Sequence, residues 1–386
     1  MNKKDLISVI ICVAIFGLTY GLSAPLIATR LQDNGFSESY IGLNAAMQAI
    51  GVFTVAPFIP RLFKRLRPRL LLGTSLAAVA VIMLLFTLLP FFYWFGLRFA
   101  LGIFSEIIMV LTETWINDAT VEQARARTMA WYTAGISTGF ACGPLILTLS
   151  SSQSNFPFFI GTVIVLLALV LVTLLGMAQH HSSTRQVISF MKSIRIAFLM
   201  IVATGLNAAV EVAGLNFLPL YAESHGWSRQ HAVGLISVLM LGAILLQPVI
   251  GMIADSVDRR RLIVILALLS TVGAAIWPWL LSWPVAAYLI LFVWGGLFVG
   301  IYTVAITWAG ATFSGAELAG VYAAASVAWG AGALLGPLLC GLAMSATQNG
   351  LPLMVGALCG LFCLMAAVDL HLHGPDEPDN SLPPLS

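Results

Sequence analysis

Twelve apolar stretches of about twenty residues follow one another along the chain, and most of the segments that join them are short. A stretch of this length crosses the hydrocarbon core of a bilayer as one helix. Because lipid offers backbone groups no hydrogen bonds, only helices or a closed barrel can span it, and these stretches lack the alternation of barrel strands. The predicted helices are 6–28, 40–60, 70–90, 92–115, 128–149, 157–178, 196–218, 231–253, 262–281, 285–307, 318–341 and 351–370. The sequence therefore predicts an all-α membrane protein with twelve transmembrane helices.

The composition agrees with a surface that faces lipid. Of 386 residues, 60% are hydrophobic and 9% are charged, whereas soluble proteins carry about 25% charged residues. The first apolar run is too long for the core of a signal peptide, so we interpret it as a retained helix. The five cysteines lie in apolar segments without the spacing of metal ligands or disulfides. We expect no metal and no cofactor.

The distribution of lysine and arginine predicts the orientation. With the N-terminus inside, fifteen basic residues lie in cytoplasmic segments, and only Arg30 and Arg229 lie outside. Loops rich in lysine and arginine stay in the cytoplasm. We therefore expect a multi-pass protein of the plasma (inner) membrane with both termini in the cytoplasm.

The longest internal connection, residues 179–195, divides the chain into two sets of six helices. We predict an N-terminal six-helix bundle over 1–178, a cytoplasmic linker over 179–195 and a C-terminal six-helix bundle over 196–370. Residues 371–386 are rich in proline and acidic residues, so they are predicted to form a disordered cytoplasmic tail.

The two halves share landmarks in the same order. Pro25 recurs as Pro219, and the turn that contains Gly35 recurs at Gly226. The dipeptide Gly143-Pro144 also recurs, as Gly336-Pro337. The repeats predict two pseudo-symmetric bundles, with the substrate site between them near the middle of the membrane.

Among the apolar stretches, 97–118 carries the most charge, with Arg98, Glu106 and Glu113. At about 100° per residue, these three lie on one stripe of the helix together with Gly102, Ser105 and Met109. A charge in hydrocarbon costs at least about 2.5–3.5 kcal/mol, so the stripe must face protein or a cavity. It is either a polar pathway through the membrane or an ion-paired seam between packed helices. In the seventh stretch, Asn207 and Glu211 are one turn apart and share a face.

Several motifs resemble those of the major facilitator superfamily, and the resemblance covers all twelve predicted helices. Between helices eight and nine, Gly251 is followed by Asp255 and by the basic run Arg259-Arg260-Arg261, which is similar to the loop signature of the family. Arg98-Phe-Ala-Leu-Gly102 resembles the motif of the fourth helix, whose arginine is linked to proton movement.

A glycine pattern resembles the signature associated with antiporters in this superfamily. It occurs once as Gly135-x3-Gly139-x3-Gly143-Pro144 and again as Gly332-x3-Gly336-Pro337. Glycine at every fourth position also allows plain close packing of helices. The first copy has Leu147-Thr148 where the fuller motif has two glycines, which weakens the antiport inference.

The resemblance also implies positions for the cavity and for a cytoplasmic gate. Helices one, four, seven and ten of the family line the cavity, so Glu211 would face the stripe of Glu106 and Glu113. Asp255 would face the start of the fifth helix, near Arg127 and Thr128. Arg61 stands where the equivalent loop of the first half should have an acid.

Glu317, at the start of the eleventh helix, is a candidate partner for Arg61, although it also suits the first turn of its own helix. The predicted gate therefore consists of Arg61, Asp255, Arg259, Arg260 and Glu317.

The sequence thus predicts a secondary active transporter that works by alternating access. We favour proton-coupled efflux of a small organic compound, in which Glu106 or Glu113 takes up the proton and Arg98 modulates its affinity. The alternatives are proton-coupled or facilitated uptake of a small polar nutrient, and a receptor or assembly protein that kept the fold. No phosphate-binding loop or nucleophile–base pattern indicates an enzyme. The expected partners are a small molecule, protons and lipid, without nucleic acid, and we expect a monomer.

Overall fold

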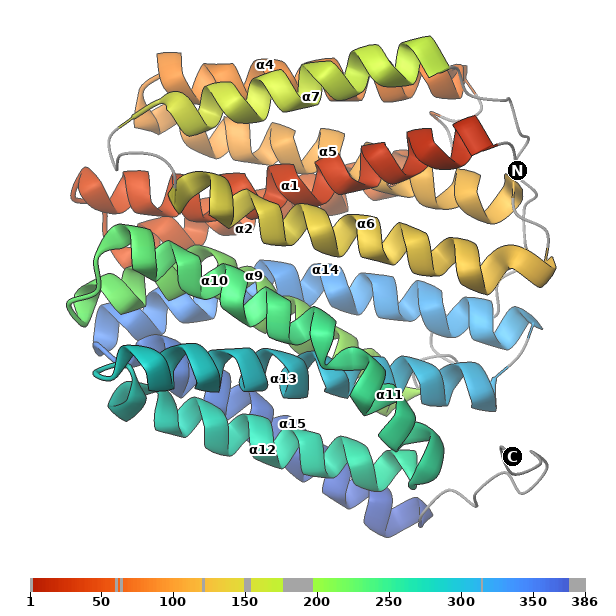
Figure 1. The fold of residues 1–386 in the computed structure, drawn as a ribbon, viewed down its shortest axis with the longest axis vertical. Coiled ribbons are helices and arrows are strands. Elements are labelled where there is room, and N and C mark those ends of the chain that lie inside the picture. Colours follow the sequence, from red (N-terminus) through yellow and green to blue (C-terminus); the bar gives the residue numbers. More distant parts are fainter. Residues whose placement is uncertain are drawn as a thin grey trace. The chain divides into compact units, whose positions relative to one another are not determined.

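The computed structural model describes residues 3–59, 62, 65–119, 122–148, 154–175, 197–313 and 315–374. All regular structure in these ranges is helical (Figure 1). The elements are α1 (Lys3–Asp33), α2 (Glu38–Val55), η1 (Ala56–Phe58), α4 (Pro68–Leu88), η2 (Phe91–Tyr93), α5 (Trp94–Ala119), α6 (Glu122–Thr148), α7 (Phe156–Leu175), α9 (Phe198–Ser224), α10 (Arg229–Leu245), α11 (Gln247–Ser256), α12 (Arg259–Leu280), α13 (Pro284–Thr312), α14 (Gly315–Ala346) and α15 (Gly350–His373). The predicted all-α class is confirmed.

Within the described ranges, ten segments are long and apolar enough to cross a membrane. The other two predicted crossings, 40–60 and 128–149, correspond to α2 and α6. The first of these contains two buried amides, Asn44 and Gln48, which lower its hydropathy. In the second, the apolar part whose side chains are described is Gly135–Thr148. The pattern of helices agrees with the predicted twelve crossings.

The predicted single helix 231–253 is two helices in the structure. The chain breaks between Leu245 and Gln247, and Pro248 stands in the first turn of α11. Proline has no backbone N–H and its ring crowds the preceding turn, so it interrupts a helix. The amide of Gln247 donates to the carbonyl of Gly296 at 3.3 Å, which ties the start of α11 to α13.

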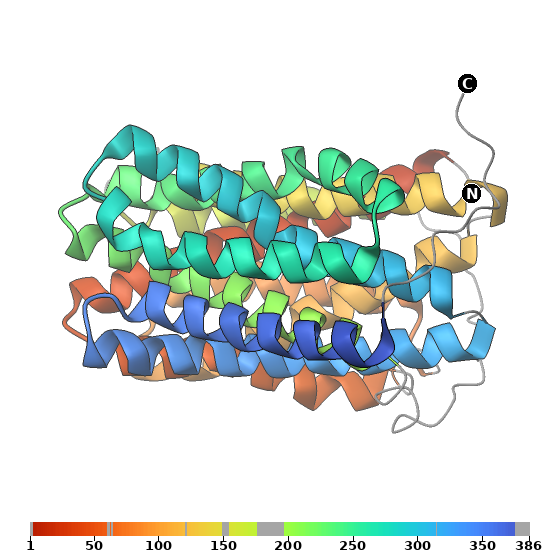
Figure 2. The same cartoon turned by 90° about the horizontal axis from the view of Figure 1, so that it is seen from below.

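The helices form two compact units. The first contains residues 1–184, 212–237 and 333–348, and the second contains 185–211, 238–332 and 349–386. In the first unit α1 packs on α6, α2 on α5, and α4 on α7. In the second, α12 lies beside α15 and α13 (Figures 1 and 2). The linker 179–195 lies outside the described residues, so the predicted division at that point stays a prediction.

Glycines bring several helix pairs into backbone contact. A Cβ atom on Gly139 of α6 would lie 2.1 Å from the carbonyl oxygen of Ala14 in α1. In the second unit, a Cβ on Gly332 of α14 would lie 2.0 Å from the carbonyl oxygen of Gly205 in α9. Any side chain at these positions would collide with the neighbouring helix. One copy of the repeated glycine pattern therefore packs α6 on α1, and the other packs α14 on α9.

The same turn ends α1 and α9. The N–H of Phe36 donates to the carbonyl of Leu31, and the N–H of Trp227 donates to the carbonyl of Ala222, both at 3.1 Å. The glycine before each donor has a positive φ, 78° at Gly35 and 88° at Gly226. This is the Schellman arrangement, in which glycine supplies the left-handed residue. The repeat seen in the sequence is thus a repeat of backbone conformation, and it places these two helix ends in equivalent positions.

Candidate functional site

Arg98 lies near the start of the apolar helix α5, as its fifth residue, and its side chain is 1% exposed. Its Nη2 donates a hydrogen bond of 2.8 Å to Oδ1 of Asn216 in α9. The amide nitrogen of Asn216 in turn donates to the carbonyl of Val212 at 2.7 Å, which fixes the orientation of the amide. We call the pair of Arg98 and Asn216 the arginine centre.

The arginine centre holds a cation with a neutral partner. Among the described residues, Nε of Arg98 has no hydrogen-bond acceptor and the guanidinium has no carboxylate within 4.0 Å. Burying a charge without an opposite charge is costly. The arginine centre is therefore a place where a negative charge, from a side chain or a ligand, would be strongly stabilised.

The two acids of the predicted stripe lie further along α5. Glu106 is two turns from Arg98 and is half-buried, with polar contacts of its own. The backbone of Glu113 is part of α5, but its side chain lies outside the described residues. Ser105 is buried beside them. The structure thus puts Arg98 and Glu106 on one helix.

Two buried amides of α2 lie beside this part of α5. Asn44 and Gln48 are 1% and 2% exposed. In the described part of the chain, neither polar side-chain atom of Asn44 has a partner, nor has Oε1 of Gln48. The backbone of Gln48 touches Gly102, and because α2 and α5 are antiparallel, Asn44 lies at about the level of Glu106. Sequence reasoning missed both amides, although two amides in an apolar stretch were a visible signal.

Asn207 and Glu211, the polar pair of α9 in the second unit, are in contact. The amide nitrogen of Asn207 donates to Oε2 of Glu211 at 3.2 Å. Asn207 is 9% exposed and Glu211 is half-buried. The other amide atom, Oδ1 of Asn207, has no donor among the described residues. The pair therefore has one free acceptor beside a carboxylate.

A cluster of charges joins the ends of α1 and α9 that are predicted to face outside. The guanidinium of Arg229 donates to both carboxylate oxygens of Glu223, at 2.8 and 2.9 Å, and also to both oxygens of Asp33. We call Asp33, Glu223 and Arg229 the outer ion cluster. We did not predict this cluster from the sequence. The available signal was Arg229 itself, because it is one of only two basic residues predicted to lie outside.

The predicted gate residues are only partly described. Arg61 and the side chains of Asp255 and Glu317 lie outside the described residues. Arg260 is directed at α15 and α13: its Nη1 is 3.6 Å from Oδ2 of Asp369, and its guanidinium lies 5.2 Å from the ring centre of Trp308.

The small size of Gly251, the glycine of the loop signature, would allow another helix to approach closely. In the part of the chain that the structure describes, no atom lies within 4 Å of the place where a Cβ of Gly251 would be, so no described helix makes this approach.

Comparison with known families decides the identity of the fold. The sequence profile of the Major Facilitator Superfamily matches residues 9–337 and, in a second alignment, residues 200–385. The chain belongs to this superfamily. Its members are multi-pass membrane transporters, so the predicted family is confirmed.

Relatives and solved structures agree with this assignment. The MFS-type transporter YfkF of Bacillus subtilis is 25% identical over 276 residues, which are 69% of this chain and 70% of YfkF. A crystal structure of the nucleoside transporter NupG has a TM-score of 0.75 at 15% identity and covers 97% of this chain and 100% of its own. A D-xylose–proton symporter has a TM-score of 0.74 at 15% identity, with 94% and 97% covered. At these identities the solved structures establish the fold alone.

Proposed function

We propose that this superfamily member exports a small organic compound by alternating access and takes protons inward in exchange. The observation that carries the proposal is the arginine centre, a fully buried cation held by a neutral amide. A transporter must bury its charged site when it changes sides, and the cost of burial depends on the net charge. Protonation of nearby acids is the means to change that charge.

The charge balance of α5 explains how a proton would be coupled to the movement. With both acids ionised, the stripe of Arg98, Glu106 and Glu113 has a net charge of −1. One bound proton makes it neutral, and a neutral stripe costs less to enclose. A cationic substrate on an ionised acid would have the same effect, so substrate and proton exclude each other. Glu211, with the free acceptor of Asn207, supplies a second polar contact for the substrate.

Alternating access also needs closures on both sides. We assign the outer closure to the outer ion cluster, because Arg229 joins the end of α1 to the end of α9. For the inner closure we retain the predicted residues Arg61, Asp255, Arg259, Arg260 and Glu317. We further propose that the protein lies in the inner membrane as a monomer with both termini in the cytoplasm.

Proton-coupled or facilitated uptake of a polar nutrient is the second candidate. It is favoured by the names of two structural neighbours, a nucleoside transporter and a D-xylose–proton symporter. The two candidates differ in the direction of net movement. Cells that express the protein would lose the compound under the first proposal and accumulate it under the second.

The test begins with the purified protein in detergent. A compound that binds the folded state raises its melting temperature, so a thermal screen identifies ligands, which are then assayed in proteoliposomes with an imposed pH gradient. Replacement of the coupling acid, by Glu106→Gln or Glu113→Gln, should abolish gradient-driven movement and leave exchange of substrate intact. Glu38→Gln, at the start of α2 and outside the stripe, is the matched control. Full gradient-driven movement in both single variants and in the double variant would remove the proton role.

A further inference from the structure

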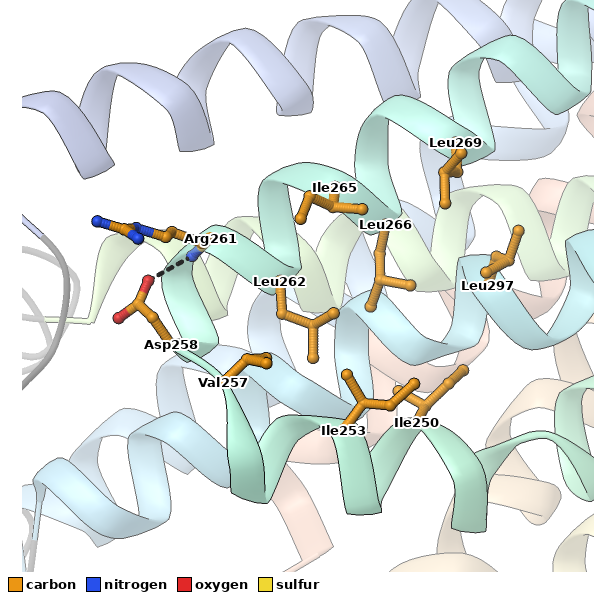
Figure 3. A pocket seen from close by; sticks show the side chains of 10 residues that line it. All are labelled: Ile250, Ile253, Val257, Asp258, Arg261, Leu262, Ile265, Leu266, Leu269 and Leu297. Carbon is orange, nitrogen blue, oxygen red and sulfur yellow. Dashed lines mark hydrogen bonds between the residues drawn. The ribbon is translucent and has the colours of Figure 1, made fainter. Parts of the chain in front are cut away.

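The second unit contains a groove that the transport mechanism does not use. It has a volume of about 660 Å³ and lies between α11 and α12, and Leu297 of α13 lines it at the end away from Arg261 (Figure 3). Its walls are apolar, with Ile250 and Ile253 from α11, Leu262, Leu266 and Leu269 from α12, and Leu297 from α13. The side chains on its rim are exposed, for example Ile253 at 41% and Leu269 at 44%.

The break at Pro248 explains why the groove exists. Because the helix is interrupted there, α11 follows its own direction, and both α11 and α12 pack on α13. The chain then turns at Val257, whose backbone is extended, and enters α12. Two helices that meet at a turn and lie on a common third helix leave a groove between them. An apolar groove on the surface of a membrane protein faces acyl chains.

One end of the groove is polar and positively charged. Arg261 and Asp258 lie there (Figure 3). The carboxylate of Asp258 accepts the backbone N–H of Arg261 at 2.7 Å and so caps α12. The guanidinium of Arg261 is exposed, and among the described residues it has no carboxylate within 4.0 Å. Residues 258–261 comprise three arginines and one aspartate, so this end attracts anions.

We propose that the groove binds an acyl chain of an anionic bilayer phospholipid, with the lipid phosphate on Arg261. The dimensions agree with this ligand. From Arg261 to Leu269 is eight residues, or about 12 Å along the helix, and one leaflet of the hydrocarbon core is about 15 Å thick. The groove therefore offers a cation where a headgroup lies and apolar side chains where its chain lies. A guanidinium binds phosphate through two parallel hydrogen bonds, and basic residues at the ends of helices attract anionic lipids.

The test measures lipid binding to the purified full-length protein by native mass spectrometry. Dioleoyl phosphatidylglycerol and dioleoyl phosphatidylcholine have the same chains and differ in net charge. We expect tighter binding of phosphatidylglycerol, and a loss of about fivefold in this preference in Arg261→Gln. Arg261→Lys, which keeps the charge, should keep most of the preference. Ile265→Trp, which fills the groove from an exposed position, should weaken binding of both lipids.

Arg67→Gln is the matched control, because Arg67 is an exposed arginine that directly precedes α4 and does not line the groove. Its preference should equal that of the wild type. The proposal is overturned if Arg261→Gln keeps the wild-type preference, if Arg67→Gln loses as much, or if Ile265→Trp binds lipid normally. A dimer that depends on Arg261 would assign the groove to a second copy of the chain instead. None of these outcomes depends on transport, so the proposed function is tested separately.

Discussion

Removal of Arg229 should open the outer side of the protein. The three side chains of the outer ion cluster are 16–24% exposed, so solvent screens their attraction, and each ion pair contributes about 0.2–1 kcal/mol. Arg229 makes two such pairs, but Glu223 is only six residues from it, so only the pair with Asp33 of α1 is lost when the outer side opens. Since about 1.4 kcal/mol changes an equilibrium constant tenfold, the loss of one pair in Arg229→Gln should raise the ratio of open to closed molecules by about 1.4- to 5-fold.

A cysteine at position 237 would report this change. Ser237 in α10 is 4% exposed, and its hydroxyl lies 3.4 Å from the carbonyl oxygen of Ala141 in α6. Separation of these two helices would expose the site. In a background without the five native cysteines, the rate at which Ser237→Cys reacts with a membrane-impermeant maleimide is proportional to the open fraction while the closed state dominates. The rate should therefore rise by the same factor of about 1.4 to 5 in Arg229→Gln.

Arg67→Gln is the control for this measurement. Arg67 is an exposed arginine that directly precedes α4, on the side predicted to be cytoplasmic, and it takes no part in the ion pairs of the outer ion cluster. This variant should react at the wild-type rate. The reasoning is refuted if Arg229→Gln and the wild type react equally fast.

Three further predictions concern single contacts. Asn216→Leu removes the amide that accepts the hydrogen bond of buried Arg98 and should destabilise the protein by about 1.5–3 kcal/mol, which a lower melting temperature in detergent would report; an unchanged value would contradict the assigned role. In Gly139→Val the new Cβ would lie only 2.1 Å from a carbonyl oxygen of α1, so overpacking should lower the free energy of unfolding by about 1–3 kcal/mol. A valine introduced at an exposed position of α6 should leave this free energy unchanged. Arg61→Glu should impair transport and the added Glu317→Arg should restore part of it, and a double variant no better than the single one would exclude the pair.

Apolarity and periodicity predicted the helices. A helix that crosses a bilayer must satisfy its backbone hydrogen bonds within its own segment, so the local sequence is enough to identify it. The break of the eighth crossing at Pro248 was predictable, since proline interrupts helices. The position of α11 relative to α12 was not predictable, because it depends on the packing of both helices against α13. The groove at this break could not be derived, because it is a property of three helices together.

The candidate site was only partly predictable, since its contacts join distant residues. Arg98 was evident as a charge in an apolar stretch, but its partner Asn216 is 118 residues away along the chain. A single sequence carries no signal of a contact between residues so far apart. Asp33 and Arg229 are 196 residues apart, and each taken alone is an ordinary charge at a helix end. By contrast, Asn207 and Glu211 are one helical turn apart, so their proximity followed from periodicity alone.

The pairing of Arg98 with Asn216 also has a consequence for the way this protein is made. A chain grows at about 5–20 residues per second, and Asn216 is synthesised 118 residues after Arg98. The arginine is therefore synthesised about 6–24 seconds before its partner. Until the partner reaches the membrane, α5 carries an insertion cost of about 2.5–3.5 kcal/mol that only earlier helices are available to offset. The buried amides of α2, which packs directly on α5, are synthesised before α5 and provide a polar surface for it.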